Sequence, residues 1–205
     1  ARSRGFEAID LGWLPDDPAI LTKALASGID QVDVLLTTGG AAGGDADLLW
    51  HVLSQPMHHQ DMALPTEAHA WKLKLRPGRP LVIGRIGQTP VFGLPGNPVA
   101  ALLSFLFVID AALQKMAGII DPRPLPRIRA RAGTAIRKRP GRQELLRVTL
   151  CYHESDNLPV ALPAGSQSSA QLRSVAEADG IAVLPEDQGP VTEGDRLDVV
   201  PLHGL

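Results

Sequence analysis

Two glycine-rich turns hold the residues best suited to bind an anion. One is T-T-G-G-A-A-G-G-D-A-D at residues 37–47, and the other is G-L-P-G-N-P at residues 93–98. In the second turn Asn97 is a good N-cap and Pro98 suits the first helical position, so a helix is predicted to begin there. The unpaired N–H groups and the dipole of a helix N-terminus attract anions, and the two glycines permit positive φ and a close approach of a ligand. A well-capped turn without a ligand would have the same sequence, and both interpretations stay open.

The glycines of the first turn match neither a dinucleotide-binding fingerprint nor a phosphate loop with its Gly-Lys-Ser/Thr ending, so the sequence lacks NAD and ATP motifs. Asp45 and Asp47 lie near the expected start of the next helix. Either could cap that helix, or bind a hard cation such as Mg²⁺ through its carboxylate oxygens. Capping accounts well for Asp45 and less well for Asp47, so Asp47 is the candidate metal ligand.

Four basic residues surround the Pro77-Gly78 turn, namely Lys72, Lys74, Arg76 and Arg79. In a strand the first three would point to one face, because side chains alternate. Such a face could guard a strand edge against pairing. It could also hold an anionic ligand, which arginine grips with two N–H groups at once.

Two other features invite a chemical interpretation and do not support one well. His58-His59 with Asp61 could suggest a metal, but the segment is typical of a solvated loop, and adjacent histidines do not easily face one ion. Cys151 lies in an alternating segment and is predicted to be buried rather than reactive.

Strand and helix patterns alternate in the first part of the chain. Val32–Thr37 is a short apolar run typical of a strand buried on both faces of a parallel sheet. Residues 54–70 show no periodicity and are predicted to be a mobile insertion. The remaining predicted elements are a helix from Asp45 to about Leu53, strands at Leu81–Ile86 and Pro90–Phe92, and a helix over residues 98–117. This alternation predicts an α/β layer with a partly parallel sheet flanked by helices.

The chain opens with an unusual pattern. Residues 1–5 are typical of the last turn of a helix with Gly5 at the C′ position, followed by a predicted strand at Phe6–Leu11. Asp17 is predicted to cap a helix that starts at Pro18 and runs to about Ala26. A domain rarely begins with the end of a helix, so we expect earlier residues, including a first strand of the sheet, to be missing.

A proline-rich stretch over residues 118–126 predicts a domain boundary. After it come short alternating segments separated by turn residues, which predict a small, mostly β barrel. The expected domains are therefore residues 1–120 and 121–205. Residues 123–147 hold nine basic side chains against Glu144 alone. This pattern is typical of a solvated barrel face, although it could also receive phosphates across a domain interface.

Composition excludes several classes of protein. The 205 residues carry a net charge of −2, which argues against general nucleic-acid binding. No signal peptide is apparent, and polar residues interrupt the apolar run at 99–116, so we expect neither secretion nor a membrane span. A single cysteine fits a reducing compartment, and the chain is predicted to be cytoplasmic.

With these residues assembled, the chain resembles the C-terminal part of the molybdopterin molybdotransferase family, which includes the E domain of gephyrin. The matching segments follow the family's order over almost the whole chain: D-L-G-W-L-P-D-D-P (10–18), D-V-L-L-T-T-G-G-A-A-G-G-D-A-D (33–47), K-L-K-L-R-P-G-R-P (72–80), V-F-G-L-P-G-N-P-V-A-A (91–101), G-R-Q-E-L-L-R-V (141–148), Q-S-S-A-Q-L-R-S (167–174), A-D-G-I-A-V-L-P-E (178–186) and G-D-R-L-D-V-V-P-L (194–202). The resemblance implies a molybdopterin-binding α/β domain followed by a β-barrel domain. It also implies that two N-terminal domains are missing, so we expect the chain to be inactive alone.

The resemblance implies an enzyme for the last step of molybdenum cofactor synthesis. Molybdate would be placed on the dithiolene of adenylated molybdopterin, and AMP would be released with the help of Mg²⁺. The expected partners are these small molecules and a second copy of the chain in a head-to-tail homodimer. Two alternatives stay open: a molybdopterin adenylyltransferase, which usually lacks the barrel, and a gephyrin-like scaffold that binds a peptide.

The resemblance also implies roles for particular residues. Asp16 and Asp47 would contact the pterin nucleotide or its cation, and Lys72 and Arg76 would hold molybdate or phosphate. The oxyanion pocket would be formed by Gly39, Gly40, Pro95, Gly96, Asn97 and Pro98. Arg147 and Ser169 of the partner's barrel would reach the nucleotide. The chain departs from the family pattern where Arg76 and Arg79 replace lysines, where Ser168-Ser169-Ala170 replaces Gly-Ser-Gly, and where residues 55–70 are longer than usual.

Overall fold

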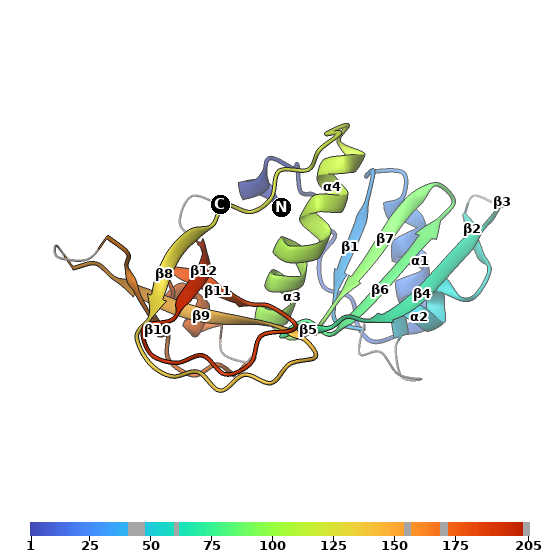
Figure 1. Cartoon of the computed structure of the whole chain (residues 1–205). Helices are drawn as coiled ribbons and strands as arrows, with labels where there is room; N and C mark the ends of the chain where they lie inside the picture. Colours follow the sequence, from blue (N-terminus) through green and yellow to red (C-terminus); the bar gives the residue numbers. More distant parts are fainter. Residues whose placement is uncertain (41–47, 60–61, 154–156, 169–171, 203–205) are drawn as a thin grey trace. The chain divides into compact units, whose positions relative to one another are not determined.

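The computed structural model describes residues 1–40, 48–59, 62–153, 157–168 and 172–202. The chain forms two compact units, coloured along the sequence in Figure 1. Unit 1 comprises Ala1–Leu73 and Gly78–Phe105, and unit 2 comprises Lys74–Pro77 and Leu106–Leu205. The domain boundary predicted at residue 120 stays a prediction.

The centre of unit 1 is a four-stranded sheet. In spatial order its strands are β1 (Leu35–Thr38), β7 (Thr89–Leu94), β6 (Pro80–Ile86) and β4 (Thr66–Lys72). β1 and β7 are parallel, whereas β6 pairs antiparallel with both β7 and β4 (Figure 1). The partly parallel sheet predicted from the sequence is confirmed.

Helices α1 (Pro18–Gly28) and α2 (Leu48–Leu53) complete the core of unit 1. Aliphatic side chains from both helices and from β1, β2, β6 and β7 form one buried cluster: Leu21, Leu25, Leu35, Leu49, Val52, Leu53, Met57, Val82, Ile86 and Val91. α1 begins where the sequence predicts. Asp17 Oδ1 accepts hydrogen bonds from the N–H groups of Ala19 at 2.8 Å and Ile20 at 2.9 Å.

Residues 54–70 are not the unstructured insertion that the sequence predicted. They contain a short hairpin of β2 (Met57–His59) and β3 (Met62–Leu64), followed by most of β4. β4 is an edge strand, and its residues Glu67, His69 and Trp71 are exposed. An edge strand buries little, so its composition resembles that of a loop.

The start of the chain differs from the prediction in one respect. A short 3-10 helix, η1 (Arg2–Arg4), ends at Gly5 with φ 83°, which confirms the predicted glycine cap. Phe6–Leu11 forms no strand. Ile9 and Leu11 remain 49% and 41% exposed, so this segment buries too little apolar surface to hold a strand in place.

One long helical stretch follows β7. It consists of α3 (Pro98–Ser104), the π-helical segment η2 (Phe105–Ile109) and α4 (Asp110–Met116), which confirms the predicted helix. Among the described residues this is the one helix long and apolar enough to cross a membrane, with a mean hydropathy of 1.7. Within the structure 61% of it is buried, as is usual for a core helix.

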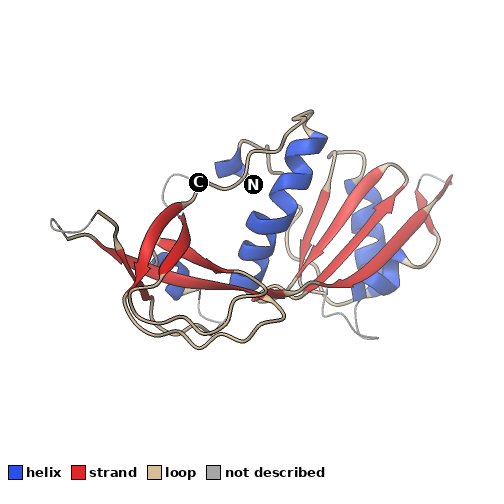
Figure 2. Ribbon diagram, in the orientation of Figure 1, coloured by secondary structure: helices blue, strands red, loops and turns tan. Residues whose placement is uncertain are grey.

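Unit 2 contains a closed barrel of five strands, shown in red in Figure 2. In order around the barrel they are β10 (Val160–Pro163), β8 (Ile128–Ala132), β12 (Arg196–Pro201), β11 (Gly180–Leu184) and β9 (Gln143–Cys151). β9 closes the barrel by pairing with β10, and the short strand β5 (Leu75–Arg76) pairs parallel with the start of β9. The small barrel predicted from the sequence is confirmed.

The interior of the barrel contains small and branched aliphatic side chains: Ala130, Ala132, Ile136, Val148, Ala161, Ala182, Leu184, Val191, Leu197 and Val199. One short helix, α5 (Arg173–Ala176), lies between β10 and β11. Cys151 is exposed, so the prediction of a buried cysteine is wrong. Burial decreases over the last three residues of β9, where the strand no longer faces the core.

Candidate anion-binding site

The two glycine-rich turns meet at one edge of the sheet in unit 1. β1 and β7 are parallel, with Thr38 opposite Leu94, so both strands end at the same edge. The N–H of Gly39 donates to the carbonyl oxygen of Leu94 at 3.1 Å, which joins the first residue after β1 to the last residue of β7. Ligands of α/β sheets usually bind beyond the carboxyl ends of such strands.

Direct contact between the turns explains one of the glycines. A Cβ atom on Gly96 would lie 3.3 Å from the Cα and 3.8 Å from the nitrogen of Gly39. Gly39 and Gly40 have φ of 88° and 69°, which a larger residue adopts only with strain. The glycines of the second turn do not use the positive φ that they permit: Gly93 lies in β7, and Gly96 is outside the left-handed region.

The second turn ends in a capped helix, as predicted. Asn97 Oδ1 accepts a hydrogen bond from the N–H of Ala100 at 3.3 Å, and Pro98 is the first residue of α3. Pro95 is buried, whereas Gly96 and Pro98 are exposed. The backbone between the two prolines is therefore accessible from solvent at the N-terminus of a long helix.

Thr37 adds a polar group at the same edge. Its Oγ1 is buried and has no hydrogen-bond partner among the described residues. A buried hydroxyl without a partner is uncommon, and this one has hydrogen-bonding capacity that the described residues do not use. The described residues of the two turns are all uncharged, so this part of unit 1 offers backbone and hydroxyl dipoles to an anion.

In unit 2 the predicted barrel residue Arg147 is completely buried in β9. Its Nη2 donates to the carbonyl oxygens of Ser166 at 2.9 Å and Ser168 at 3.2 Å, and its backbone exchanges two hydrogen bonds with the side chain of Gln167. Burial lowers the pKa of the Arg147 guanidinium below its ordinary value, although arginine stays protonated. Its Nε is buried without a partner among the described residues, so this cation keeps one unused donor.

Two family models match the chain. One, described as "Probable molybdopterin binding domain", matches residues 1–115, which is more than half of the chain. The chain belongs to this molybdopterin-binding family. A second model, described as "MoeA C-terminal region (domain IV)", matches residues 129–202 and coincides with the barrel.

Curated relatives are longer than this chain. It is 29% identical over 199 residues to the molybdopterin molybdenumtransferase of Haemophilus influenzae, covering 97% of this chain and 47% of the relative. It is 26% identical over 211 residues to gephyrin of Dictyostelium discoideum, covering 93% of this chain and 28% of the relative. The chain thus spans about half, or less, of the relatives it matches.

A solved structure has the same fold. The molybdopterin biosynthesis moea protein from Pyrococcus horikosii matches with a TM-score of 0.73 and 27% sequence identity. The match covers 98% of this chain and 45% of that one. The predicted fold class and the predicted family are therefore both confirmed.

The family resemblance placed other site residues in unit 1, and the structure leaves two of them exposed. Asp16 precedes the cap residue Asp17 and is exposed. Lys72 is the exposed last residue of β4, paired with Pro80 of β6. Their roles stay predictions. Asp47 and Ser169 lie outside the described residues.

The prediction that Lys72, Lys74 and Arg76 share one face of one strand is wrong. β4 ends at Lys72, and the N–H of Leu73 donates to the carbonyl oxygen of Arg79 at 2.7 Å, which closes a loop over the residues between them. Within that loop Arg76 belongs to β5 and pairs with Glu144 of β9 in unit 2. Strand pairing, rather than side-chain alternation, decides where these cations lie.

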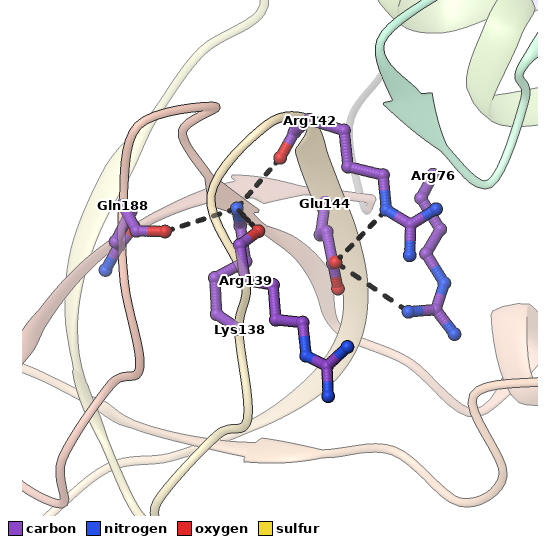
Figure 3. Close-up of polar contacts among 6 residues, drawn as sticks. All are labelled: Arg76, Lys138, Arg139, Arg142, Glu144 and Gln188. Atoms are coloured by element: carbon purple, nitrogen blue, oxygen red, sulfur yellow. Dashed lines mark hydrogen bonds and ion pairs between the residues drawn. The ribbon is translucent and has the colours of Figure 1, made fainter.

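Sequence reasoning missed a polar cluster around Glu144 (Figure 3). Glu144 is 8% exposed, and its Oε1 lies 3.4 Å from Arg142 Nε and 3.7 Å from Arg76 Nη1. Beside it, the buried Lys138 donates from Nζ to the carbonyl oxygens of Arg139, Arg142 and Gln188. A lone acid within a strongly basic run was the available signal, because such a residue is usually an ion-pair partner.

Proposed function

We propose that this chain supplies the molybdopterin-binding domain and the barrel of a molybdopterin molybdotransferase. The enzyme would insert molybdate into adenylated molybdopterin and release AMP. The observation that carries the proposal is the contact between the two glycine-rich turns at the carboxyl ends of β1 and β7, with Gly39 N–H on the Leu94 carbonyl and Gly96 against Gly39. Molybdate and the phosphates of the pterin nucleotide are all anions, and this edge offers dipoles to an anion.

Roles within the site follow from the chemistry of each group. The Pro95–Pro98 backbone carries no charge, so it would select a tetrahedral oxyanion through its shape and its dipoles. Lys72 and Arg76 would supply positive charge to molybdate or to a phosphate. The family resemblance assigns Arg147 and Ser169 of a partner's barrel to the nucleotide, so the proposal includes a homodimer. Because Arg147 is completely buried in this chain, that contact would require the residues over it to move.

Mg²⁺ is part of the same proposal. The described residues contain no group of three or more His, Cys, Asp or Glu side chains that could hold a metal ion by themselves. Mg²⁺ commonly uses one or two carboxylates together with substrate phosphates, and the exposed Asp16 with Asp47 would suit that mode. When bound, the ion would screen the phosphates and polarise the anhydride.

A chimera tests the proposal directly. This chain would replace the matching segment, 47% of the Haemophilus influenzae relative, and the product would be assayed with adenylated molybdopterin, molybdate and Mg²⁺. We expect AMP release and active cofactor from the chimera, and no turnover from residues 1–205 alone. A folded chimera that releases no AMP would overturn the proposal.

Variants of the chimera test the turn contact. Gly96→Val places a branched side chain against Gly39 and should abolish AMP release. Gly189→Val is the matched control, because an added Cβ there meets nothing within 4 Å. If Gly96→Val were as active as the control, the turn contact would not be part of the site.

An assay with different substrates distinguishes the adenylyltransferase alternative from the molybdotransferase. The chimera would be supplied with molybdopterin and ATP, and adenylated product would be sought. Formation of that product without molybdate would favour the alternative over the transferase.

A further inference from the structure

Two arginines in unit 2 share one carboxylate oxygen. Arg76 and Glu144 are register partners in the parallel pair of β5 and β9. Arg142 lies one residue before β9 and two before Glu144, and its Nε lies 3.4 Å from Glu144 Oε1. Arg76 Nη1 and Arg142 Nε both lie within 4 Å of Glu144 Oε1 (Figure 3).

One carboxylate does not satisfy these two cations. Each guanidinium has five N–H donors in a planar fork, and the two side chains remain 61% (Arg76) and 49% (Arg142) exposed. Glu144 is nearly buried beneath them and neutralises only one of the two charges. The cluster therefore has one excess positive charge and several N–H donors on its solvent side.

The loop that presents Arg142 is held in place. Buried Lys138 binds the carbonyl oxygens of Arg139, Arg142 and Gln188 at 2.9, 2.8 and 3.3 Å. Gly141 N–H donates to the carbonyl oxygen of Glu186 at 2.8 Å. Binding of a ligand to Arg142 therefore costs this loop little backbone entropy, which favours binding.

We propose that Arg76 and Arg142, anchored by Glu144, form a binding site for a tetrahedral dianion of the phosphate and molybdate class. The proposed function already gives Arg76 an oxyanion role, and the inference rests on it for the identity of the dianion. Arg142 is the new member of the site, and Lys138 holds the loop that carries it. A dianion on both guanidinium groups would replace water with charge-assisted hydrogen bonds, two from each fork.

The test is calorimetric titration of the chain with sodium molybdate, inorganic phosphate and AMP, each in separate experiments at low ionic strength. Arg142→Ala should lower the affinity for the dianion that occupies the site by about tenfold, since it removes charge-assisted hydrogen bonds. Arg139→Ala is the matched control. It lies in the same loop, its side chain has no contact with Glu144, and only its backbone carbonyl binds Lys138. We expect Arg139→Ala to bind the dianion with an affinity within about twofold of that of the parent chain.

The three titrants identify the source of the anion. A loss confined to molybdate would assign the site to the metal oxyanion, and a loss for AMP and phosphate would assign it to the nucleotide's phosphate. No loss for any titrant in Arg142→Ala, or equal losses in Arg142→Ala and Arg139→Ala, would overturn the proposal and leave the arginines as a solvated cover for Glu144.

A double variant tests whether one anion touches both arginines. If it does, Arg76→Ala with Arg142→Ala should weaken binding by clearly less than the product of the two single effects, because the first loss already releases the anion. Independent effects would overturn the shared site. AMP release by the chimera is a separate readout: dianion binding that depends on Arg142 without AMP release would refute the transferase and leave this site intact.

Discussion

The two units of this chain offer an anion different kinds of groups, namely neutral dipoles in unit 1 and side-chain cations in unit 2. In the proposed anion site of unit 1, the described residues of the two glycine-rich turns have no charged side chain, and the groups present are backbone N–H groups, a helix N-terminus and the Thr37 hydroxyl. The arginine pair of unit 2 uses side-chain cations gathered around Glu144. A neutral dipole has no charge to desolvate. The site in unit 1 therefore requires only that the backbones of its two turns lie close together.

Charged groups have to be held in place against their preference for water. Unit 2 accordingly contains polar side chains that are buried and hydrogen-bonded, such as Lys138 at 3% and Arg147 at 0% exposure. A buried cation without partners would cost several kcal/mol, and here backbone carbonyls meet most of that requirement. Unit 1 therefore depends on glycine and unit 2 on buried hydrogen bonds, and substitutions should affect each unit accordingly.

The largest effect is expected from Arg147→Ala in unit 2. The carbonyl oxygens of Ser166 and Ser168 would lose their donor and a cavity would form, so the free energy of unfolding should fall by about 3 kcal/mol. Chemical denaturation followed by circular dichroism measures the fall. All three tryptophans lie in unit 1, so their fluorescence reports whether that unit is unaffected.

Arg147→Met is the control for packing, because it fills much of the space without the donors. We expect it to be intermediate between the parent and Arg147→Ala. Equal stability of all three proteins would show that unit 2 does not depend on this buried cation, and the comparison between the units would fail.

A smaller effect is expected from Gly39→Ala in unit 1. A Cβ there meets nothing within 4 Å, so the cost comes from the backbone alone, with φ at 88°. A non-glycine residue in the left-handed region lowers the free energy of unfolding by about 1 to 2 kcal/mol, and thermal unfolding monitored by tryptophan fluorescence would detect that change. Gly189→Ala in unit 2 is also in open space but outside the left-handed region, and circular dichroism should show the stability of that unit unchanged or slightly raised.

The smallest effect concerns an exposed carboxylate that contrasts with buried Glu144. Glu67 accepts from His69 Nε2 at 3.0 Å and from Arg85 Nε at 2.9 Å, and these hydrogen bonds, His69 first, lower its pKa below the ordinary value of 4.5. The stabilisation is therefore present at neutral pH and lost as the pH falls through the lowered pKa.

Carboxyl NMR titration would measure this pKa in the parent and in His69→Ala. Truncation should return the pKa of Glu67 toward its ordinary value. An unchanged pKa would show that solvent completely screens the contact between Glu67 and His69. The exposed Glu67 would then contrast even more with the nearly buried Glu144.

Much of the fold could be predicted because its signals are local. Asp17-Pro18 and Asn97-Pro98 both start helices as predicted, since a cap residue and a proline act within one turn. The barrel strands alternate in sequence, and this alternation predicts the small barrel that the structure contains. The edge strand β4 was missed, because an exposed strand shows neither a long apolar run nor a capping signal.

The candidate site was predictable in part. Gly39 and Gly96 were singled out, and their contact follows from the parallel pairing of β1 and β7. The face shared by Lys72 and Arg76 was not correct, because pairing of β5 with β9 places Arg76 in the other unit. Glu144 and Arg142 received no role, since an ion pair between strands depends on register.

The α/β and barrel fold classes, the caps of the main helices, the two glycine-rich turns and the family could be read from the sequence, because each rests on short-range patterns or an ordered set of motifs. The tertiary structure alone decided that Gly96 lies against Gly39, that Arg147 is buried on the Ser166 and Ser168 carbonyls, and that Arg76 and Arg142 share Glu144. These contacts join residues far apart in the chain, and only strand register and burial bring them within reach.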